Sequence, residues 1–379
     1  MDFPLLTSFL DSHSTEMIPG MDVVIYKDHA PIYRHLFGFR DREAQKPMDG
    51  TELYWLFSAT KVFTSAAAMQ LIEKGVIKLD DPVSKYLPEF GTLSVKDEGR
   101  IRACTVPLTV WHLLTMTGGF NYDIECPSLK KAALYSGGKA DTLTMIRALA
   151  EEPLDFEPGT HFRYSLCLDV LAAVIEVASG MRFGEYVKRN LFEPLGVKRS
   201  GFLGEDINEF AKLYTFDGSA DRAVPRKEDT ICHYRLTENF ESGGAGMYSC
   251  VDDYILLADA LACGGVGKSG NRILKPETVK LMSTDQLTPE LRREYSNHTG
   301  PTYSYAMGVR TKVDPDPTSP VGEFGWDGAA NAYTLIDPVN HVSAYLGIHI
   351  LNFGYGYFTL HHKIREYMYA DMRAQGIVK

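Results

Sequence analysis

The chain lacks the features that mark several classes of protein. Its 379 residues include only six cysteines, and no two of them form a Cys-x-x-Cys pair, which argues against a zinc site and against a disulfide framework. The apolar runs fall well short of the roughly 20 residues that a membrane span requires. No glycine-rich phosphate loop and no spaced His/Asp metal cluster occurs. We therefore expect no metal or organic cofactor, and reduced thiols at Cys104, Cys126, Cys167, Cys232, Cys250 and Cys263.

Positive charge is scarce as well. The chain has 39 lysines and arginines against 49 aspartates and glutamates, which gives a formal net charge of −10. Nucleic-acid binding needs a basic face, so the composition disfavours that class of partner. The opening MDFPLLTSFLDSHSTEM has no basic segment ahead of its apolar residues, so no signal peptide is expected. These absences predict a cytoplasmic protein with neither nucleic-acid nor membrane partners, and they leave its oligomeric state open.

Strand patterns lie near both ends of the chain, and helical patterns lie between them. Residues 21–41 alternate and turn at Lys27-Asp28-His29, which predicts a two-stranded hairpin. Apolar residues recur with helical spacing in the Ala-rich segment that starts at Ser58, and Gly75 is well placed to end that helix. The same reasoning predicts helices at 3–10, 108–117, 143–152, 168–180, 249–265 and 357–374, and strands at 305–311, 321–326, 331–337 and 341–351.

The order of these elements predicts the fold. Strands from both ends can form one antiparallel sheet flanked by helices, with a helical segment inserted between them. We expect an α/β (α+β) fold in which residues 1–80 and 240–379 form the sheet domain and residues 81–239 form a mostly helical inserted domain. Within the helix at 249–265, Ser249 and Asp252 have the spacing of a capping box, so Ser249 is the expected N-cap.

Ser58 and Lys61 are the candidates for a catalytic pair. A serine hydroxyl is a weak nucleophile at neutral pH and needs a neighbouring base to take its proton. Positions i and i+3 of a helix share one face, so the Lys61 amine can reach the Ser58 hydroxyl. The helix N-terminus also favours negative charge on the serine oxygen. For the lysine to act as the base, its pKa must lie well below the free value of about 10.4.

The Ser-x-x-Lys spacing alone is weak, because the chain contains it three times. The other copies start at Ser128 and Ser136. Ser128 follows Pro127 in a stretch that we interpret as irregular, and the two glycines after Ser136 place it off a helix. Ser58 instead opens a strong Ala-rich helix. From context alone, a plain helix N-cap at Ser58 remains the alternative to a nucleophile.

A long segment around Ser58 carries a family resemblance. The most specific stretch is FSATKVFTSAAAMQLIEKGVIKLDDPVSKYLPEF (57–90), and TVWHLLTMTGGF (109–120), EPGTHFRYS (157–165), LFEPLGVKRSGF (191–202) and SGGAGMYSCVDDY (242–254) add to it. With these motifs the chain resembles the serine β-lactamase-like and penicillin-binding-protein-like hydrolases, especially the class C β-lactamase and esterase branch. The resemblance implies a β-lactamase/transpeptidase-like fold and an acyl-enzyme on Ser58.

The resemblance also implies a tyrosine that shares the proton shuttle, in a Tyr-x-Asn or related element. Tyr164-Ser165-Leu166 fits by position, because it follows the Ser58 helix and stands just before another helix. Leu166 replaces an asparagine that contacts the substrate amide in β-lactam-processing members. Leucine cannot form that hydrogen bond, which shifts the expected substrate away from β-lactams.

The third element of the family is a Lys-Thr-Gly or His-Thr-Gly on a strand beside the serine. A literal Tyr295-Ser296-Asn297 is followed directly by His298-Thr299-Gly300. Two elements that approach the serine from different domains cannot stand end to end, and Pro301 follows where a strand should run. We therefore interpret 285–304 as a surface loop.

The positional counterpart of the third element is Trp326-Asp327-Gly328-Ala329, which stands between strand-like runs. By this correspondence the backbone N–H groups of Ser58 and Ala329 form the oxyanion hole, and Gly328 lets the substrate approach closely. Trp326 and Asp327 replace the usual cationic or hydroxyl residues, which removes the expected grip on a substrate carboxylate. Trp326 either packs against an acyl or alcohol group or belongs to the core.

These residues together predict a serine hydrolase for small-molecule substrates, in first place an esterase on small or medium acyl esters. The alternatives are a D-amino-acid peptidase or amidase, a weak β-lactamase and an acyltransferase. A non-catalytic penicillin-recognising module is the alternative outside enzymes, and the joint presence of Ser58, Lys61 and Tyr164 argues against it. We interpret His112 as structural, and His361-His362 as solvated or half-buried.

Overall fold

Strands from the two ends of the chain pair in a single antiparallel sheet. The computed structural model describes residues 1–204, 207–226 and 234–378, and its sheet has the order β10-β11-β12-β13-β14-β1-β2-β3. The N-terminal β1 therefore lies between the C-terminal β14 and its hairpin partner β2, as the sequence predicted. The strands are β1 (Gly20–Lys27), β2 (Ala30–Asp41), β3 (Lys46–Pro47), β10 (Tyr303–Tyr305), β11 (Arg310–Lys312), β12 (Phe324–Gly325), β13 (Tyr333–Asp337) and β14 (Val342–Ile348).

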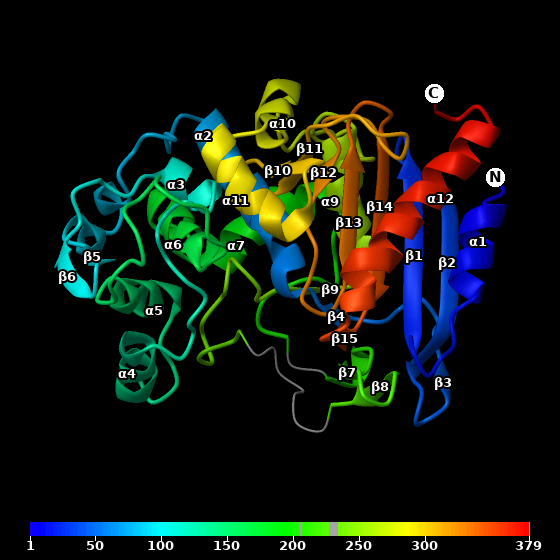
Figure 1. Ribbon diagram of the computed structural model, residues 1–379, viewed down its shortest axis with the longest axis horizontal. Coiled ribbons are helices and arrows are strands. Elements are labelled where there is room, and N and C mark those ends of the chain that lie inside the picture. Colours follow the sequence, from blue (N-terminus) through cyan, green and yellow to red (C-terminus); the bar gives the residue numbers. More distant parts are fainter. Residues whose placement is uncertain (205–206, 227–233, 379) are drawn as a thin grey trace.

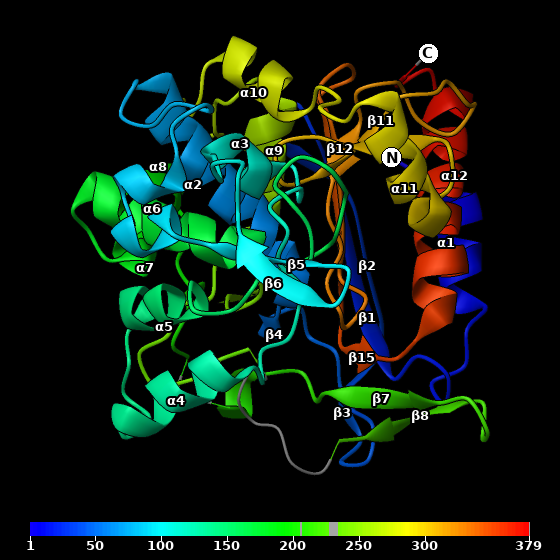
Figure 2. The same ribbon diagram turned by 60° about the vertical axis from the view of Figure 1, so that its left-hand side comes forward.

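Helices cover both faces of this sheet. In Figure 1 α1 and α12 run side by side along one face, while α9 packs against β1, β13 and β14 on the other. Figure 2 shows α3 to α8 gathered on the side away from α1 and α12. The helices are α1 (Pro4–Asp11), α2 (Thr60–Glu73), α3 (Val110–Leu114), α4 (Pro127–Tyr135), α5 (Thr142–Leu149), α6 (Cys167–Ser179), α7 (Phe183–Val187), α8 (Glu193–Leu195), α9 (Val251–Ala262), α10 (Pro276–Met282), α11 (Pro289–Thr299) and α12 (His361–Ala374).

The sheet separates two hydrophobic cores, and β1 contributes to both. Val23 and Ile25 pack into the core beneath α1 and α12. Val24, between them in sequence, packs into the core shared with α2, α6 and α9. Successive side chains of a strand point to opposite faces. All three side chains are buried, so both faces of β1 are covered. The two-sided burial fixes the position of β1 at the centre of the molecule.

Helix α2 lies at the centre of the second core and is buried on nearly all sides. It packs against α6, α7 and α10. Its run of alanines at 66–68 lets these helices approach closely, and Gly75 ends it with a positive φ of 69°. The predicted helix start near Ser58 and the predicted end at Gly75 are both confirmed.

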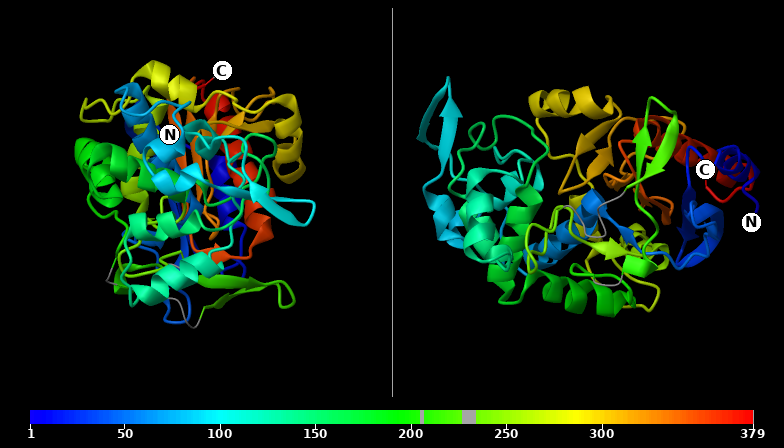
Figure 3. Two further views of the ribbon diagram at one scale, coloured as in Figure 1. Left: turned by 90° about the vertical axis from the view of Figure 1, so that its left-hand side faces the viewer. Right: turned by 90° about the horizontal axis from the view of Figure 1, so that it is seen from below.

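The inserted segment contains the expected helices and also two hairpins that the sequence did not predict. β6 is exposed along its whole length, so it lacks the apolar alternation that marks a strand. Figure 3 shows the hairpin of β5 and β6 projecting from the helical side. The division of the chain at residues 80 and 240 stays a prediction. The short strands form the pairs β4 (Tyr54–Trp55) with β9 (Tyr248–Ser249), β5 (Ser94–Asp97) with β6 (Arg100–Ala103), and β7 (Tyr214–Asp217) with both β8 (Arg222–Pro225) and β15 (Ile350–Leu351).

Three local predictions are wrong. The segment 285–304 contains α11 and the start of β10 rather than a surface loop, and Thr288 caps that helix by accepting from the Leu291 N–H. The run 305–311 is two strands, because Gly308 turns the chain with a φ of 79°. Helix α9 has Cys250 at its N-cap, since the Ser249 hydroxyl bonds to Ser200 instead.

The described helices and cysteines bear on two further expectations. Across the described residues, we find no helix that is long and apolar enough to cross a membrane. Five of the six cysteines carry free thiols, and Cys232 lies outside the described residues.

Candidate active site

Ser58 lies in a single 3-10 turn, Phe57–Ala59, that leads directly into α2. The pairing of β4 with β9 and the hydrogen bond from the Leu56 N–H to the Met247 carbonyl fix the chain ahead of this turn. Phe57 has a positive φ of 48°, which is costly for a bulky residue, and its ring is buried. Tertiary packing therefore holds Ser58, half-buried, at the N-terminal end of the helix.

Lys61 lies one turn further on and is completely buried. Its Nζ lies 3.3 Å from Ser58 Oγ, 3.2 Å from the Tyr122 hydroxyl and 2.7 Å from the Gly244 carbonyl oxygen. Burial lowers the pKa of Lys61 from 10.5 to about 7, although the nearby Asp169 carboxylate opposes this shift. Lys61 is thus partly neutral near pH 7, which is the condition for a general base.

Two stacked tyrosines flank the serine and the lysine. The Tyr164 hydroxyl donates to Ser58 Oγ at 2.6 Å, and the rings of Tyr164 and Tyr122 stack with their centroids 5.4 Å apart. Lys61 Nζ lies 4.7 Å from the centroid of the Tyr164 ring. Burial raises the pKa of both hydroxyls above the ordinary tyrosine value. Of these three groups only Lys61 changes its charge near neutral pH, and Tyr164 is suited to relay a proton as a neutral hydroxyl.

Trp326 packs directly against this centre. Its Nε1 donates to the Tyr164 hydroxyl at 3.2 Å, and the two rings stack with their centroids 5.5 Å apart. The edge-to-face contact with Tyr305 connects Trp326 to the core behind it. Trp326 therefore orients Tyr164, a role that the sequence did not suggest.

Ala329, the expected partner of Ser58 in the oxyanion hole, lies beside Gly328 in the turn between β12 and β13. A Cβ at Gly328 would collide with the Leu56 carbonyl oxygen, so glycine is needed for this turn to approach the segment before Ser58. The Tyr357 hydroxyl donates to the Gly328 carbonyl at 2.7 Å and holds the turn from the other side. The structure thus gives Gly328 a packing reason, while the roles of the Ser58 and Ala329 N–H groups stay predictions.

Asp327 is not an open carboxylate but one half of an ion pair. Arg310 Nη1 on β11 lies 2.5 Å from Asp327 Oδ1, and His361 Nδ1 lies 3.8 Å from Oδ2. Burial alone would raise the pKa of Asp327, but Arg310 and His361 outweigh it and hold the pKa below its usual range. His361 is buried, contrary to the sequence-based expectation, because it stacks on Tyr333 at the start of α12.

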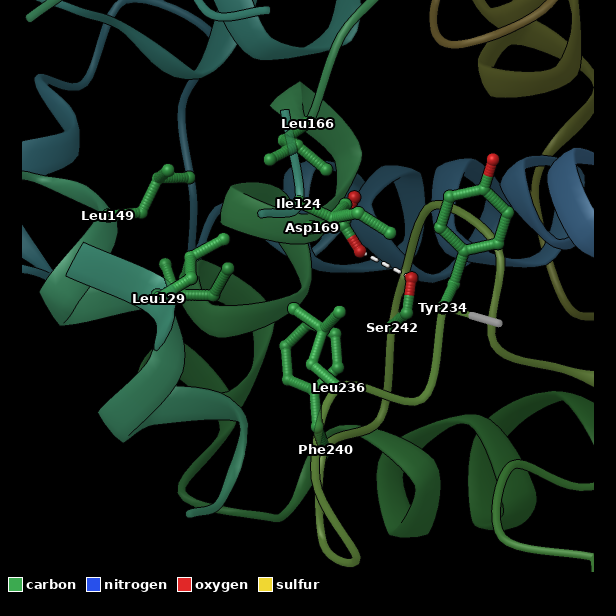
Figure 4. A pocket seen from close by; sticks show the side chains of 10 residues that line it. Ile124, Leu129, Leu149, Leu166, Asp169, Tyr234, Leu236, Phe240 and Ser242 are labelled. Carbon is green, nitrogen blue, oxygen red and sulfur yellow. Dashed lines mark hydrogen bonds between the residues drawn. The ribbon is translucent and has the colours of Figure 1, made fainter. Parts of the chain in front are cut away.

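Leu166 lines an apolar pocket beside the site. Figure 4 shows its walls around Asp169 and Ser242, which are joined by a hydrogen bond. The enclosed volume is about 10 Å³, which is the space of roughly one water molecule. Tyr234 connects the pocket to the Ser58 centre, because its ring meets Tyr122 edge-on at 5.7 Å. The remaining walls are Ile124, Leu129, Ile146, Leu149, Leu236 and Phe240.

Sequence reasoning missed Tyr122 and Asp169. The buried Asp169 carboxylate accepts hydrogen bonds from the Ser242 hydroxyl and from the Gly244 N–H, and so holds the segment whose carbonyl receives Lys61. The sequence signal for this contact is the Gly-rich run at 242–246, which belongs to the family-like stretch 242–254. Tyr122 lies just past the family-like stretch 109–120, but nothing in the sequence links it to Lys61, which it meets only through the fold.

The remaining candidates have structural surroundings. His112 closes a capping box with Thr109, and burial lowers its pKa to about 4, in agreement with the structural interpretation. Ser128 is buried within α4 rather than in an irregular stretch, and Ser136 caps the end of that helix, before two glycines of positive φ.

One group of possible metal ligands is found among the described residues. His29, Asp259 and Cys263 have ligand atoms within 4.8 Å of one another. His29 Nδ1 lies 2.7 Å from Asp259, and the His29 N–H also donates to that carboxylate. These hydrogen bonds fasten the hairpin turn of β1 and β2 to the end of α9.

Comparison with known proteins assigns the chain and its fold to a family. A family model described as Beta-lactamase matches residues 7–358. Esterase EstB of Burkholderia gladioli is 34% identical over 263 residues, which cover 64% of this chain and 65% of that protein. A putative D-alanyl-D-alanine carboxypeptidase of Escherichia coli K12 is 27% identical over 86% of this chain and 77% of that protein. The solved structure of EstCE1, described as a hydrolase with promiscuous acyltransferase activity, has a TM-score of 0.79 and 27% identity over 97% of both chains. Because the family match runs over most of its length, the chain belongs to the Beta-lactamase family and is a serine hydrolase.

Proposed function

We propose that the protein is an esterase that forms an acyl-enzyme on Ser58 from esters of small or medium acyl groups. The observation that carries this proposal is the convergence of two groups on Ser58 Oγ. Lys61 Nζ lies 3.3 Å away and the Tyr164 hydroxyl 2.6 Å away. A base of lowered pKa and a proton relay on one hydroxyl are what an activated serine nucleophile needs.

The proposed reaction has two steps. Neutral Lys61 takes the Ser58 proton, Ser58 Oγ attacks the ester carbonyl, and the N–H groups of Ser58 and Ala329 stabilise the oxyanion. Tyr164 relays a proton to the leaving alcohol, and the acyl group stays on Ser58. In the second step water enters by the reverse proton path and releases the acid.

The neighbouring side chains favour esters over β-lactams. Leu166 cannot donate or accept a hydrogen bond with a substrate amide, and it is part of an apolar wall. By the correspondence with the family's third element, Trp326 replaces a cationic or hydroxyl residue, and its indole N–H donates to the Tyr164 hydroxyl. The similarity to an esterase from Burkholderia gladioli supports the same substrate class.

Turnover of p-nitrophenyl butyrate and of a chromogenic cephalosporin tests this proposal. We expect release of p-nitrophenol by the wild type, little or no opening of the cephalosporin, and loss of ester turnover in Ser58→Ala by at least about 10³-fold. Ser136→Ala is the matched control, because Ser136 heads another Ser-x-x-Lys sequence. Unchanged turnover in Ser58→Ala would refute the nucleophile, and a stable adduct without turnover would indicate a binding module.

Acyl transfer is the second candidate. The half-buried Ser58 can hold an acyl group while an alcohol replaces water, and EstCE1 is described as having promiscuous acyltransferase activity. Adding a primary alcohol to the butyrate assay distinguishes the two outcomes. A hydrolase gives butyric acid throughout, whereas an acyltransferase gives the new butyrate ester in proportion to the alcohol.

A further inference from the structure

Asp327 and Arg310 form a charge pair immediately beside the proposed reaction centre. Asp327 follows Trp326, whose indole N–H donates to the Tyr164 hydroxyl. The Asp327 side chain is 26% exposed and that of Arg310 only 9%, so the carboxylate lies on the outer side of the guanidinium. The negative charge of Asp327 also acts on the Tyr164 and Tyr357 hydroxyls. The carboxylate is therefore the more accessible charge of this pair, and it belongs to the residue that follows Trp326.

The guanidinium beneath it is fully engaged. Arg310 Nη1 pairs with Asp327 at 2.5 Å, and Nη2 donates to the Thr334 carbonyl at 2.9 Å and lies 3.9 Å from Glu323. Glu323 lies 3.8 Å from a second buried arginine, Arg365. Burial raises the pKa of Glu323 to about 7, whereas the pKa of Asp327 is held below its usual range, so Asp327 is the charged partner of Arg310 at neutral pH.

This pairing has a chemical reason. An unpaired carboxylate one residue from Gly328 and Ala329 would oppose the negative charge that develops on the substrate oxygen. Arg310 cancels that effect for an uncharged substrate. It does not cancel the contact repulsion that a second carboxylate would meet at Asp327, because like charges a few ångströms apart repel strongly where water is scarce.

We propose that Asp327 is a specificity residue that screens Arg310, so that the enzyme accepts uncharged esters and rejects esters with a carboxylate on the leaving alcohol. The proposed mechanism, on which this inference rests, places the leaving alcohol rather than the acyl group on the side of Asp327. Tyr164 passes a proton to the leaving alcohol, Trp326 contacts Tyr164, and the charge of Asp327 acts on the Tyr164 hydroxyl. Removal of the Asp327 charge exposes a buried guanidinium and turns the same place into a carboxylate-binding site.

A matched substrate pair tests the inference. Methyl 3-(butyryloxy)benzoate and 3-(butyryloxy)benzoate differ by one negative charge on the leaving phenol. For the wild type we expect kcat/KM for the neutral ester to exceed that for the anion by at least about 10-fold. Asp327→Asn keeps a hydrogen bond to Arg310 without the charge, and it should lower this ratio at least about 10-fold through a gain on the anion. Arg310→Gln added to Asp327→Asn should remove most of that gain.

Asp316 provides the control. It is 29% exposed and pairs at 2.5 Å with Lys312, another buried cation of β11, while its other hydrogen bonds go to Thr318. Asp316→Asn therefore removes an equivalent charge that lies outside the turn carrying Trp326, and we expect the ratio to stay unchanged. Asp327→Thr, of similar size and uncharged, is the second variant if Asp327→Asn unfolds. Equal turnover of both substrates by the wild type, or equal ratios in the variants of Asp327 and Asp316, would overturn the inference.

Binding separates this inference from the proposed function. In a Ser58→Ala background, calorimetry gives the dissociation constants of both intact substrates, with and without Asp327→Asn. A ratio that shifts toward the anion supports the screening by Asp327 even if no variant turns over an ester. Ser58-dependent turnover with an unshifted ratio leaves the esterase standing and removes the role of Asp327.

Discussion

Lys61 is the residue whose surroundings matter most for the chemistry. Its pKa of about 7 results from complete burial. The protonated form that dominates below this pKa cannot take the Ser58 proton, so kcat/KM for an ester should rise with pH through about 7 and level off above it. Rates measured between pH 5 and 9 test this. A rate that is flat or falls across that range would contradict the assignment of Lys61 as base, and Lys61→Arg should lose about 10²–10⁴-fold, because arginine stays charged.

The same burial has a cost in stability that depends on pH. The pKa of Lys61 is lowered on folding, so between about 7 and 10.5 the unfolded chain binds more protons than the folded one. The contribution of Lys61 to the free energy of unfolding therefore increases with pH across that window. Below about pH 7 the buried charge of Lys61 destabilises the folded state to its full extent. Relative to wild type, Lys61→Met should gain roughly 3–4 kcal/mol more at pH 6 than at pH 10. Urea denaturation at both pH values measures the difference. Equal gains in the free energy of unfolding at pH 6 and pH 10 would show that folding does not lower the pKa of Lys61.

Tyr122 supports Lys61 through its hydroxyl. Tyr122→Phe removes the acceptor at 3.2 Å and keeps the stacked ring. We expect kcat to fall roughly 10-fold and KM to change little, whereas Tyr164→Phe should lose about 10²-fold or more because it removes the relay. Tyr135→Phe, at an exposed position, is the control. Equal losses for Tyr122→Phe and Tyr164→Phe would contradict this division of roles.

For single residues, the sequence predicted those site positions that local helix geometry or a family motif determines. Ser58 and Lys61 are three residues apart on one helix, so local geometry was enough to pair them. Tyr164 was placed by its position before α6, and its hydroxyl does meet Ser58. Tyr122, Asp169 and the Arg310 partner of Asp327 were not predictable, because each reaches the site only through long-range packing.

Among the elements, the segment 242–249 and helix α2 form one unit. Thr64 donates to the Gly243 carbonyl at 2.6 Å, and the Met247 N–H donates to Thr60 at 3.1 Å. The segment has to lie against both α2 and α6, so it carries glycines. Movement of this segment would withdraw the Gly244 carbonyl from Lys61.

Gly243→Ala tests this unit. A Cβ there would meet the Leu168 carbonyl and lie 2.6 Å from the Ala172 Cβ. We expect a loss of about 1–3 kcal/mol in the free energy of unfolding and a fall in ester turnover. A Cβ at Gly218 meets nothing within 4 Å, so Gly218→Ala should change neither quantity. Full stability and activity in Gly243→Ala, by denaturation and steady-state kinetics, would show that the segment has room to move.

The prediction of elements failed where polar or tertiary effects decided the structure. Helix α11 was missed because family reasoning treated a polar stretch as a loop, although Pro289 after Thr288 is a helix-start signal. The strands β10 and β11 were merged because the apolar pattern continues through the turn at Gly308. The long helices α2, α6 and α12, which contain no internal glycine or proline, were predicted correctly.

For the whole molecule, the sheet separates two hydrophobic cores, and β1 is one of its inner strands. Val23 and Val24 are neighbours in sequence, but they pack into different cores. Each Val→Ala change should cost roughly 2 kcal/mol, and the pair should add within about 0.5 kcal/mol because the two side chains pack into different cores. Val23 and Ile25 share one core, so that pair should depart from additivity. Denaturation of the single and double variants measures both couplings, and strong coupling of Val23 with Val24 would contradict the separation.

The separation of the two cores by the sheet also affects which positions can vary in evolution. Substitutions in the core beneath α1 and α12 can compensate one another without contacting α2, whereas Tyr357 and His361 beside that core reach the Gly328 turn and Asp327. The protein therefore has two separate sets of core positions. The set beneath α1 and α12 can be varied to change stability, while the set around α2 is also constrained by the reaction of the enzyme.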